Sequence, residues 1–326
     1  MRVGGGSMKI AVIGCGRFGT FIAWYLDRIG HHVTLYGRKT SKHMEQLMRE
    51  HRNEFLSLPE SVALTTSLQA LEESEVVVIS INAQGLSALM EELKRYDMRD
   101  QIMVLCMKGI EIATRRRLSQ IVEAAFPQAK IAVWLGPGHV QDFYRNIPNC
   151  MVIDSRDEAV KKQLVDAFSG SLIRFYYGQD MIGNEIGAAA KNVIGIAAGM
   201  LDGLCLSSLK GALMSRGTRE VARLIKSMGG NELSAYGLCH LGDYEATVFS
   251  PHSHNRQFGE SFVKGENFSA LAEGYYTVVA LVELGKEYHT ELPICSAVYD
   301  ILYRKKDAKQ ILDELFTRSI KSEFNP

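Results

Sequence analysis

The sequence lacks a net charge, because its 37 basic residues are balanced by 37 acidic ones. It therefore has no global field to attract nucleic acid or an anionic membrane, and any phosphate site must be local. Cys-x-x-Cys pairs and histidine clusters at metal-ligand spacing are also missing, although six cysteines are scattered along the chain. This pattern argues against a zinc site or a disulfide framework, and we expect no bound metal and reduced thiols in a cytoplasmic protein.

Long apolar runs are scarce as well. A membrane span needs roughly 18 uncharged residues, and the one Gly/Ala-rich stretch that approaches this length is interrupted by Glu185 and Lys191. No secretory signal, repeat or low-complexity segment is evident. Residues 1–7, with three consecutive glycines, look like a leader or an expression remnant before a second start at Met8. With 326 residues and 46% apolar content, the chain is long enough for two globular domains.

What the sequence does have is a stretch, residues 184–199, that is apolar or small nearly all the way round a helix. Such a helix should be buried. Gly187, Lys191, Gly195 and Gly199 recur every fourth residue and share one stripe. A buried lysine needs an acidic partner, or its pKa falls toward neutrality, and either state suits proton transfer. From this segment alone, an equally good interpretation is that Lys191 reaches water and forms a surface ion pair.

A glycine-rich turn follows an apolar strand, 9–13, and precedes a helical stretch, 20–29. The turn consists of Gly14, Cys15, Gly16, Arg17, Phe18 and Gly19. In a strand–turn–helix of this kind the glycines allow a tight turn, close approach of a pyrophosphate, and packing of helix on strand. A second strand, 32–36, lies at the expected distance, so the context predicts a dinucleotide site that includes these residues.

The end of the second strand bears on which dinucleotide binds. A ribose 2′-hydroxyl is usually held there by an acid, whereas a 2′-phosphate needs a cation. This chain has Arg38 and Lys39, which favours NADP, or use of both NADP and NAD. The alternative is that both are solvated residues at the start of a helix.

Strand and helix signals alternate through the first half of the chain. Strands are predicted at 76–81, 101–106, 131–135, 150–153 and 171–176, and helices at 86–93, 113–126 and 157–168. This alternation predicts a parallel sheet with helices on both faces. After Gly178 the periodicity is helical, with a loop-rich region at 230–260, so we expect a dinucleotide-binding domain at 8–178 and an all-α domain at 179–326.

Three segments carry further candidates. Lys108 and Gly136 follow strands, at the edge where such sheets place their sites. Asp243, in an apolar segment of the second domain, is the candidate partner of Lys191. Residues 253–259 form a predicted polar loop suited to phosphate contacts. His252 and His254 are interpreted as polar loop residues, since no third metal ligand lies nearby.

Taken together, these segments resemble the NAD(P)-dependent glycerol-3-phosphate dehydrogenase family of the bacterial type, from Met8 to the end of the chain. The motifs are the glycine turn, Lys108-Gly109, Gly136-Pro137, residues 185–193, Arg216-Gly217, Leu241-Gly242-Asp243, Asn255-Arg256, Phe258-Gly259 and Leu292-Pro293-Ile294. The resemblance implies a Rossmann-type doubly wound sheet followed by an all-α domain of the 6-phosphogluconate dehydrogenase-like kind.

The resemblance also implies an activity and the residues that carry it. Hydride would pass between NAD(P)H and dihydroxyacetone phosphate, giving sn-glycerol 3-phosphate for phospholipid synthesis. Lys191 would be general acid and base, Asp243 its orienting partner, and Lys108 electrostatic support. Substrate contacts are implied for Lys108, Gly136, Asn192, Asp243, Thr247, His254 and Asn255. Cofactor contacts, besides the glycine turn and the basic pair, are implied for Lys108, Val140, His254 and Glu273.

Three departures from the family pattern affect the cofactor or substrate side. The family's arginine is His254, its Gly-Pro-Ser-Phe becomes Gly136-Pro137-Gly138-His139, and an asparagine becomes Ser208. A neutral imidazole offers no charge and no bidentate fork. Arg256, which matches the family's second basic position, is expected to compensate in part.

The departures leave alternatives open. The same chemistry could act on another small hydroxyketone or phosphorylated polyol in a specialised pathway. A cofactor-binding regulator without catalysis is a third hypothesis, which the presence of Lys191, Lys108 and Asp243 opposes. Ketopantoate reductase-like enzymes share the glycine turn and a helical lysine but would not combine Lys108-Gly109 with Gly242-Asp243. The large apolar helical domain leads us to expect a homodimer.

Overall fold

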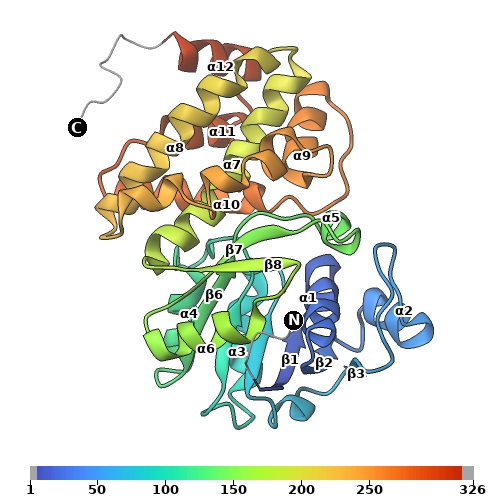
Figure 1. Ribbon diagram of the computed structural model, residues 1–326. Helices are drawn as coiled ribbons and strands as arrows, with labels where there is room; N and C mark the ends of the chain where they lie inside the picture. Colours follow the sequence, from blue (N-terminus) through green and yellow to red (C-terminus); the bar gives the residue numbers. More distant parts are fainter. Residues whose placement is uncertain (1–5, 318–326) are drawn as a thin grey trace.

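The structure, a computed structural model, describes residues 6–317. An eight-stranded sheet with helices on its faces lies below a bundle of helices, and α7 runs from the sheet into the bundle (Figure 1). The sheet order is β3-β2-β1-β4-β5-β6-β7-β8. The strands are β1 Lys9–Ile13, β2 His32–Tyr36, β3 Ala63–Thr65, β4 Val76–Ile79, β5 Ile102–Leu105, β6 Lys130–Leu135, β7 Asn149–Ser155 and β8 Ile173–Tyr177.

The sheet is mixed, not wholly parallel. The strands from β1 to β6 are parallel, whereas β7 is antiparallel to β6 and β8 is parallel to β7. The connection from β6 to β7 carries only the five-residue helix α5, Val140–Tyr144. Such a helix is only about 8 Å long and is too short to return along the sheet. The chain therefore re-enters antiparallel, and the prediction of a parallel sheet was wrong for these two strands.

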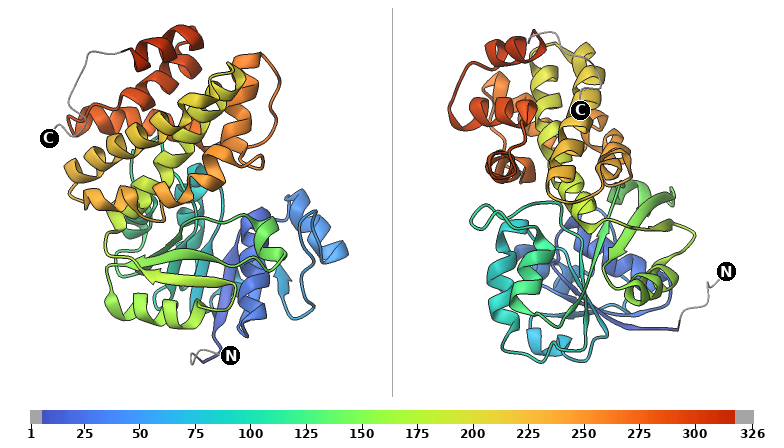
Figure 2. Two further views of the ribbon diagram at one scale, coloured as in Figure 1. Left: turned by 45° about the horizontal axis from the view of Figure 1, so that its top comes forward. Right: turned by 90° about the vertical axis from the view of Figure 1, so that its left-hand side faces the viewer.

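Alternating side chains of the central strands form two cores. Ile10 and Val12 of β1 pack with α1 and α6, whereas Ala11 and Ile13 pack with α3 and α4. The two pairs of helices lie on opposite faces of the sheet (Figure 2). Both faces of these strands are thus buried, which explains their continuous apolar sequences.

The helices of the sheet region largely follow the sequence pattern. They are α1 Arg17–Arg28, α2 Lys42–Glu50, α3 Leu86–Leu93, α4 Leu118–Ala125, α5 and α6 Glu158–Phe168. The helix predicted at 113–126 begins only at Leu118, because Arg115 has a φ of 58° and Arg117 turns its side chain inward to Glu185. β3 and α2 were not predicted.

The second region is helical throughout the described residues. Its helices are α7 Met181–Gly203, α8 Lys210–Ser227, α9 His254–Lys264, α10 Glu273–Glu287, α11 Pro293–Tyr303 and α12 Ala308–Phe316, with short helical segments η3 Ser207–Leu209, η4 Glu232–Tyr236, η5 Leu241–Asp243 and η6 Glu245–Phe249. None of the helices within residues 6–317 is long and apolar enough to cross a bilayer.

The helix α7 is the buried axis of this region, and α8, α9, α10 and α11 pack around it. Its glycines allow close approach: a Cβ at Gly199 would lie 1.9 Å from the Arg256 carbonyl oxygen, and one at Gly195 would lie 2.7 Å from Thr247. The sequence prediction of a buried helix was correct, and the alternative of a surface Lys191 was wrong, since this residue is 6% exposed.

A buried ion pair fastens the start of α7 to the sheet region. The Glu185 carboxylate accepts hydrogen bonds from Arg117 Nη1 at 2.5 Å and from the Ser119 backbone N–H at 2.9 Å. The last strand ends at Tyr177 and α7 begins at Met181. The helix that carries Lys191 is therefore fixed next to the carboxyl ends of the strands.

Candidate active site

Lys108, Lys191 and Asp243 meet in one cluster. Asp243 Oδ2 accepts a hydrogen bond from Lys108 Nζ and forms an ion pair with Lys191 Nζ, and both nitrogens lie 2.7 Å away. The side chains of Asp243 and Lys191 are 1% and 8% exposed, whereas that of Lys108 is 22% exposed. One buried carboxylate oxygen thus holds two ammonium groups, one of which is open to solvent.

Each member of the cluster comes from a different part of the fold. Lys108 follows β5, Lys191 lies in the middle of α7, and Asp243 ends η5. Lys108 Nζ also donates to the Gly136 carbonyl oxygen, at the end of β6, at 2.7 Å. The cluster therefore lies at the carboxyl edge of the parallel strands, where open α/β sheets bind ligands.

Thr247 fixes the Lys191 side chain. Lys191 Nζ donates to Thr247 Oγ1 at 2.8 Å, and Thr247 Oγ1 donates to the Asp243 carbonyl oxygen at 2.7 Å. An ammonium has three N–H donors. Two of those on Lys191 and two of those on Lys108 are accounted for, and in residues 6–317 no acceptor is found for the third on either. Both ammonium groups can therefore donate to an added oxygen.

The surroundings of Lys191 favour proton transfer near neutral pH. Burial lowers the pKa of Lys191 to about 8, with the Lys108 charge acting in the same direction and the Asp243 carboxylate opposing it. The carboxylate keeps the group charged below this pH, and the second cation makes its proton easier to release.

Asn192 and Asn255 form a chain of hydrogen bonds between the two regions. Asn192 Nδ2 donates to the Lys108 carbonyl oxygen at 3.0 Å, and Asn192 Oδ1 accepts from Asn255 Nδ2 at 3.1 Å. Asn255 Oδ1 in turn accepts from the Gly274 N–H at 2.9 Å. Both side chains hold backbone in place beside the cluster, a positioning contact that the sequence did not predict.

His240 is a residue near the cluster that the sequence did not single out. It is fully buried, its Nδ1 lies 2.8 Å from the Gly187 carbonyl oxygen, and its Nε2 lies 2.7 Å from the Tyr244 hydroxyl. Burial lowers the pKa of His240 to about 4, so the ring is neutral. A single histidine in an apolar segment gives no signal of this role, which is to hold the Asp243 segment against α7.

The glycine turn fits a dinucleotide. A Cβ on Gly14 would lie 2.1 Å from the Ser80 carbonyl oxygen, and one on Gly19 would lie 1.8 Å from the Gly14 carbonyl oxygen, so neither position admits a side chain. Beside Gly16, by contrast, nothing lies within 4 Å. That glycine presents open space at the N-terminus of α1, as close approach of a diphosphate requires.

The other predicted cofactor residues come from several elements of the fold. Arg38 and Lys39 follow β2 and are exposed. The Val140 side chain is buried in the core, and the partly buried Phe18 side chain packs against it. Glu273 begins α10, and its Oε2 is buried without a hydrogen-bond partner among the described residues. Burial raises the pKa of Glu273 to about 7.

Comparison with known proteins identifies the family. Family models described as the N-terminus and the C-terminus of NAD-dependent glycerol-3-phosphate dehydrogenase match residues 9–161 and 180–313. The chain belongs to this family. Glycerol-3-phosphate dehydrogenase [NAD(P)+] of Thermoanaerobacter sp. strain X514 is 32% identical over 98% of this chain and 99% of its own length. The enzyme of the same name from Chlorobium limicola is 33% identical over 97% and 99%, respectively.

Solved structures agree with the sequence comparison. A crystal structure of glycerol-3-phosphate dehydrogenase from Coxiella burnetii has a TM-score of 0.90 at 28% identity and covers 96% of this chain and 99% of that chain. These findings confirm the predicted family, the Rossmann-type sheet followed by a helical region, and an NAD(P)-dependent oxidoreductase.

The departures from the glycerol-3-phosphate dehydrogenase pattern lie at different distances from the cluster. Ser208, in η3, is exposed, and no hydrogen bond or ion pair between described residues joins it to the cluster. His139 lies beside the cluster, and its Nε2 is buried without a partner in the part of the chain that the structure describes. Burial and the nearby Lys191 charge lower the pKa of His139, which keeps the ring neutral.

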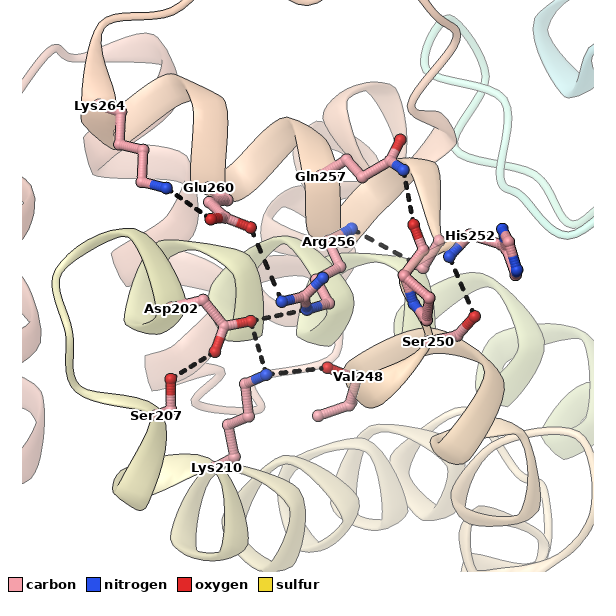
Figure 3. Close-up of polar contacts among 12 residues, drawn as sticks. Asp202, Ser207, Lys210, Val248, Ser250, His252, Arg256, Gln257, Glu260 and Lys264 are labelled. Carbon is pink, nitrogen blue, oxygen red and sulfur yellow. Dashed lines mark hydrogen bonds and ion pairs between the residues drawn. The ribbon is translucent and has the colours of Figure 1, made fainter.

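Arg256 does not compensate for the arginine missing at position 254. Its Nε donates to Asp202 Oδ2 at 2.6 Å, and its Nη2 lies 3.7 Å from Glu260 Oε2 (Figure 3). Two carboxylates thus neutralise the guanidinium, and the expectation of partial compensation was wrong. The predicted polar loop at 253–259 is also wrong: α9 begins at His254, because the Ser253 hydroxyl caps its N-terminus by accepting from the Arg256 N–H at 3.3 Å.

Proposed function

We propose that the chain reduces dihydroxyacetone phosphate to sn-glycerol 3-phosphate, and catalyses the reverse oxidation, with NADH or NADPH. The observation that carries this proposal is the pair of ammonium groups on Asp243 Oδ2, each with one unused N–H donor, in a chain of this family. Two adjacent donors of positive charge stabilise the negative charge that develops on a ketone oxygen during reduction.

In the proposed mechanism the chain supplies the proton and the electrostatic field. The bound dinucleotide supplies the hydride, which adds to the central carbon of the ketone. Lys191 donates a proton to the carbonyl oxygen as the carbon–oxygen π bond breaks, and in oxidation the neutral amine takes the hydroxyl proton back. Lys108 stabilises the developing oxyanion, and Asp243 with Thr247 holds Lys191 in the donating position.

The remaining predicted substrate residues have supporting roles in this proposal. Gly136, through its carbonyl oxygen, fixes Lys108. Asn192 and Asn255 set the distance between the Lys108 backbone and α9. In the cofactor site, Gly14, Gly16 and Gly19 shape the diphosphate site, and the exposed Arg38 and Lys39 favour NADP or dual use, since a 2′-phosphate needs a cation. Replacing both Arg38 and Lys39 by alanine should weaken the binding of NADPH more than the binding of NADH.

A spectrophotometric assay tests the activity. Consumption of NADH or NADPH at 340 nm (roughly the absorbance maximum of the reduced nicotinamide) is followed with dihydroxyacetone phosphate, and formation is followed with sn-glycerol 3-phosphate. The proposal predicts turnover in both directions with at least one cofactor. No rate above a protein-free background with either cofactor, in either direction, would contradict it.

A second candidate keeps the chemistry and changes the ketone. It is motivated by His139, whose buried Nε2 has no partner in residues 6–317 and lies beside the cluster, and by the histidine at position 254. A panel of small hydroxyketones and phosphorylated polyols in the same assay distinguishes the two. A kcat/KM for another ketone that exceeds the value for dihydroxyacetone phosphate by tenfold or more would favour this candidate.

We further propose a division into a dinucleotide-binding domain, 8–178, and a substrate domain, 179–326, with the cluster between them. The order of the elements supports it, since β8 ends at Tyr177 and α7 begins at Met181. A cytoplasmic homodimer that supplies glycerol 3-phosphate for phospholipid synthesis is proposed from the family and the composition. Sedimentation of the purified chain tests the dimer.

A further inference from the structure

Arg17 reaches from the glycine turn to the helical region. It is the first residue of α1, and its Nη2 lies 3.1 Å from Nε2 of His254, the first residue of α9. Its guanidinium carbon lies 4.4 Å from the centroid of the Phe55 ring. The N-termini of two helices, one from each region, are thus joined by one arginine.

The hydrogen bonds of His254 fix its tautomer. Its Nδ1 lies 3.3 Å from the Leu271 carbonyl oxygen, which can only accept, so Nδ1 carries the hydrogen. Nε2 then holds the lone pair and accepts from the Arg17 guanidinium. Burial and the Arg17 charge lower the pKa of His254, so the ring is neutral and the positive charge at this point belongs to Arg17.

The Arg17 guanidinium keeps most of its capacity for a ligand. It has five N–H donors, of which one goes to His254. Within residues 6–317 no carboxylate lies within ion-pair distance of it, and the nearest acidic influence is the exposed Glu54. Arg256, only two positions beyond His254, is by contrast bound by Asp202 and Glu260.

The start of α1 beside Arg17 also suits an anion. Its N-cap residue is Gly16, which supplies no capping side chain, and nothing lies within 4 Å of the position that a Cβ would take there. The uncapped first-turn amides, the open side of Gly16 and a guanidinium with unused donors therefore belong to adjacent residues at one end of α1.

We propose that the Arg17 side chain is the cation that binds a phosphate group between the two regions, and that His254 is a positioning residue that holds the guanidinium there. The resemblance implies a cation at position 254, and in this chain the cation at that point is Arg17. The phosphate belongs either to the cofactor diphosphate or to the substrate, and the experiment distinguishes these sources. This proposal rests on the proposed function only if the phosphate is that of the substrate.

The test has two arms, and each is measured on the full-length parent and three variants. The variants are Arg17→Ser, Arg17→Lys and the double variant Arg17→Ser/His254→Arg. The first arm is the Kd of NADH and of ADP-ribose by calorimetry, which needs no turnover. The second arm is the KM for dihydroxyacetone phosphate, and the kcat/KM for unphosphorylated dihydroxyacetone, at saturating cofactor. Thermal midpoints show that each variant is folded.

We expect Arg17→Ser to raise the Kd of the first arm or the KM of the second by about tenfold to a hundredfold, with kcat little changed. The reason is that charge-assisted hydrogen bonds from the guanidinium to phosphate are lost. The double variant should recover most of this loss, and Arg17→Lys, which keeps the charge without the fork, should lie between. A loss in the Kd of ADP-ribose identifies the cofactor diphosphate. A loss for dihydroxyacetone phosphate but not for dihydroxyacetone identifies the substrate phosphate.

Three results would overturn the proposal: values within twofold of the parent in both arms, a double variant as weak as Arg17→Ser, or an equal loss with dihydroxyacetone. If Arg17→Ser does not fold, Arg17→Lys equal to the parent overturns it. His254→Gln can still accept a hydrogen bond from Arg17 and should retain phosphate binding. His254→Leu cannot accept this bond and should not retain it. A chain that binds NADH through Arg17 but does not reduce dihydroxyacetone phosphate would contradict the proposed function alone.

Discussion

Two clusters along α7 have nearly the same ingredients. In one, Asp243 Oδ2 is shared by Lys108 and Lys191 at 2.7 Å each. In the other, Asp202 Oδ2 is shared by Lys210 and Arg256 at 2.6 Å each (Figure 3). The side chains of Lys191 and Lys210 are equally buried, each 8% exposed. Burial of a lysine beside an aspartate therefore does not by itself indicate a catalytic group.

The difference lies in the surroundings of the two clusters and not in their count of charges. The second cluster includes another acid, Glu260, 3.7 Å from Arg256 and paired with Lys264 at 2.6 Å, and the Ser207 hydroxyl donates to Asp202 at 2.6 Å. In spite of burial, the hydrogen bonds from Lys210 and Ser207 and the Arg256 charge lower the pKa of Asp202, which stays ionised. In the first cluster, by contrast, burial lowers the pKa of Lys191 to about 8, and the cluster lies at the carboxyl edge of the strands. A lysine with a pKa near neutrality at this edge can exchange a proton with a ligand, whereas the second network joins α7, α8 and α9.

The sharpest test of this comparison replaces one lysine in each cluster. Lys191→Met should lower kcat for dihydroxyacetone phosphate by about 10³-fold or more, because both the proton donor and a charge at the oxyanion are lost. Lys210→Met should leave kcat within about threefold and lower the thermal midpoint, because it leaves Asp202 with one cation fewer. Equal loss of kcat in both variants would show that the two clusters do not differ in kind.

The two aspartates form the next pair. Asp243→Asn should lower kcat by about 10²-fold and move the decline of reduction to lower pH, because the charge that raises the Lys191 pKa is removed. Asp202→Asn should destabilise the protein by about 2–4 kcal/mol in urea unfolding, since Lys210 and Arg256 lose a buried partner. An unchanged pH profile in Asp243→Asn would contradict the coupling of Asp243 to Lys191.

The pH dependence follows from the lowered pKa of Lys191. Reduction needs the ammonium, so kcat/KM should be level below pH 8 and fall about tenfold per unit above it. Oxidation needs the neutral amine and should rise by the same slope up to about pH 8. Steady-state rates between pH 6 and 10 in both directions test this, with Lys191→Arg, which does not titrate, as the control. Parallel profiles in the two directions would contradict the assignment.

Glu273 extends the comparison to a buried carboxyl that forms no ion pair within residues 6–317. Burial raises its pKa from 4.5 to about 7 in the folded protein. The folded state thus binds a proton more tightly than the unfolded one, and stability is lost as pH rises from 4.5 toward 7. Glu273→Gln should stabilise the protein by about 2 kcal/mol at pH 8 and by little at pH 4.5.

Urea unfolding at both values of pH measures this effect. Glu283→Gln, on the exposed side of the same helix and paired with Lys286, is the matched control and should change stability by less than about 0.5 kcal/mol. A stabilisation by Glu273→Gln that is the same at both values would show that its carboxyl does not carry the raised pKa.

Much of the fold could be predicted from local signals. The glycine turn, the apolar strands and the small residues of α7 each depend on contacts within a short segment, and the structure has them close to the predicted bounds. The reversal of β7 could not be predicted, because it depends on the path of the 136–148 connection. The start of α4 was placed too early because Arg117 is turned inward by Glu185, which is 68 residues away.

The candidate site shows the same division. Lys191 and Asp243 could be paired from the sequence because a lysine in an apolar helix needs an acid. The role of Arg256 was misjudged, since the acids that neutralise it lie on another helix and one turn along its own. The contact from Arg17 to His254 joins residues 237 positions apart, and no periodicity reports such a distance.

Titration of the lysine amines tests the central claim most directly. The chain is labelled at the lysine side chains with ¹³C and ¹⁵N, and the resonances are followed by NMR between pH 6 and 11, with Lys191→Arg to assign the signal. The account predicts that the Lys191 amine titrates near pH 8, well below the value of about 10.4 that is usual for a lysine. A Lys191 signal that stays protonated to pH 10 would contradict it.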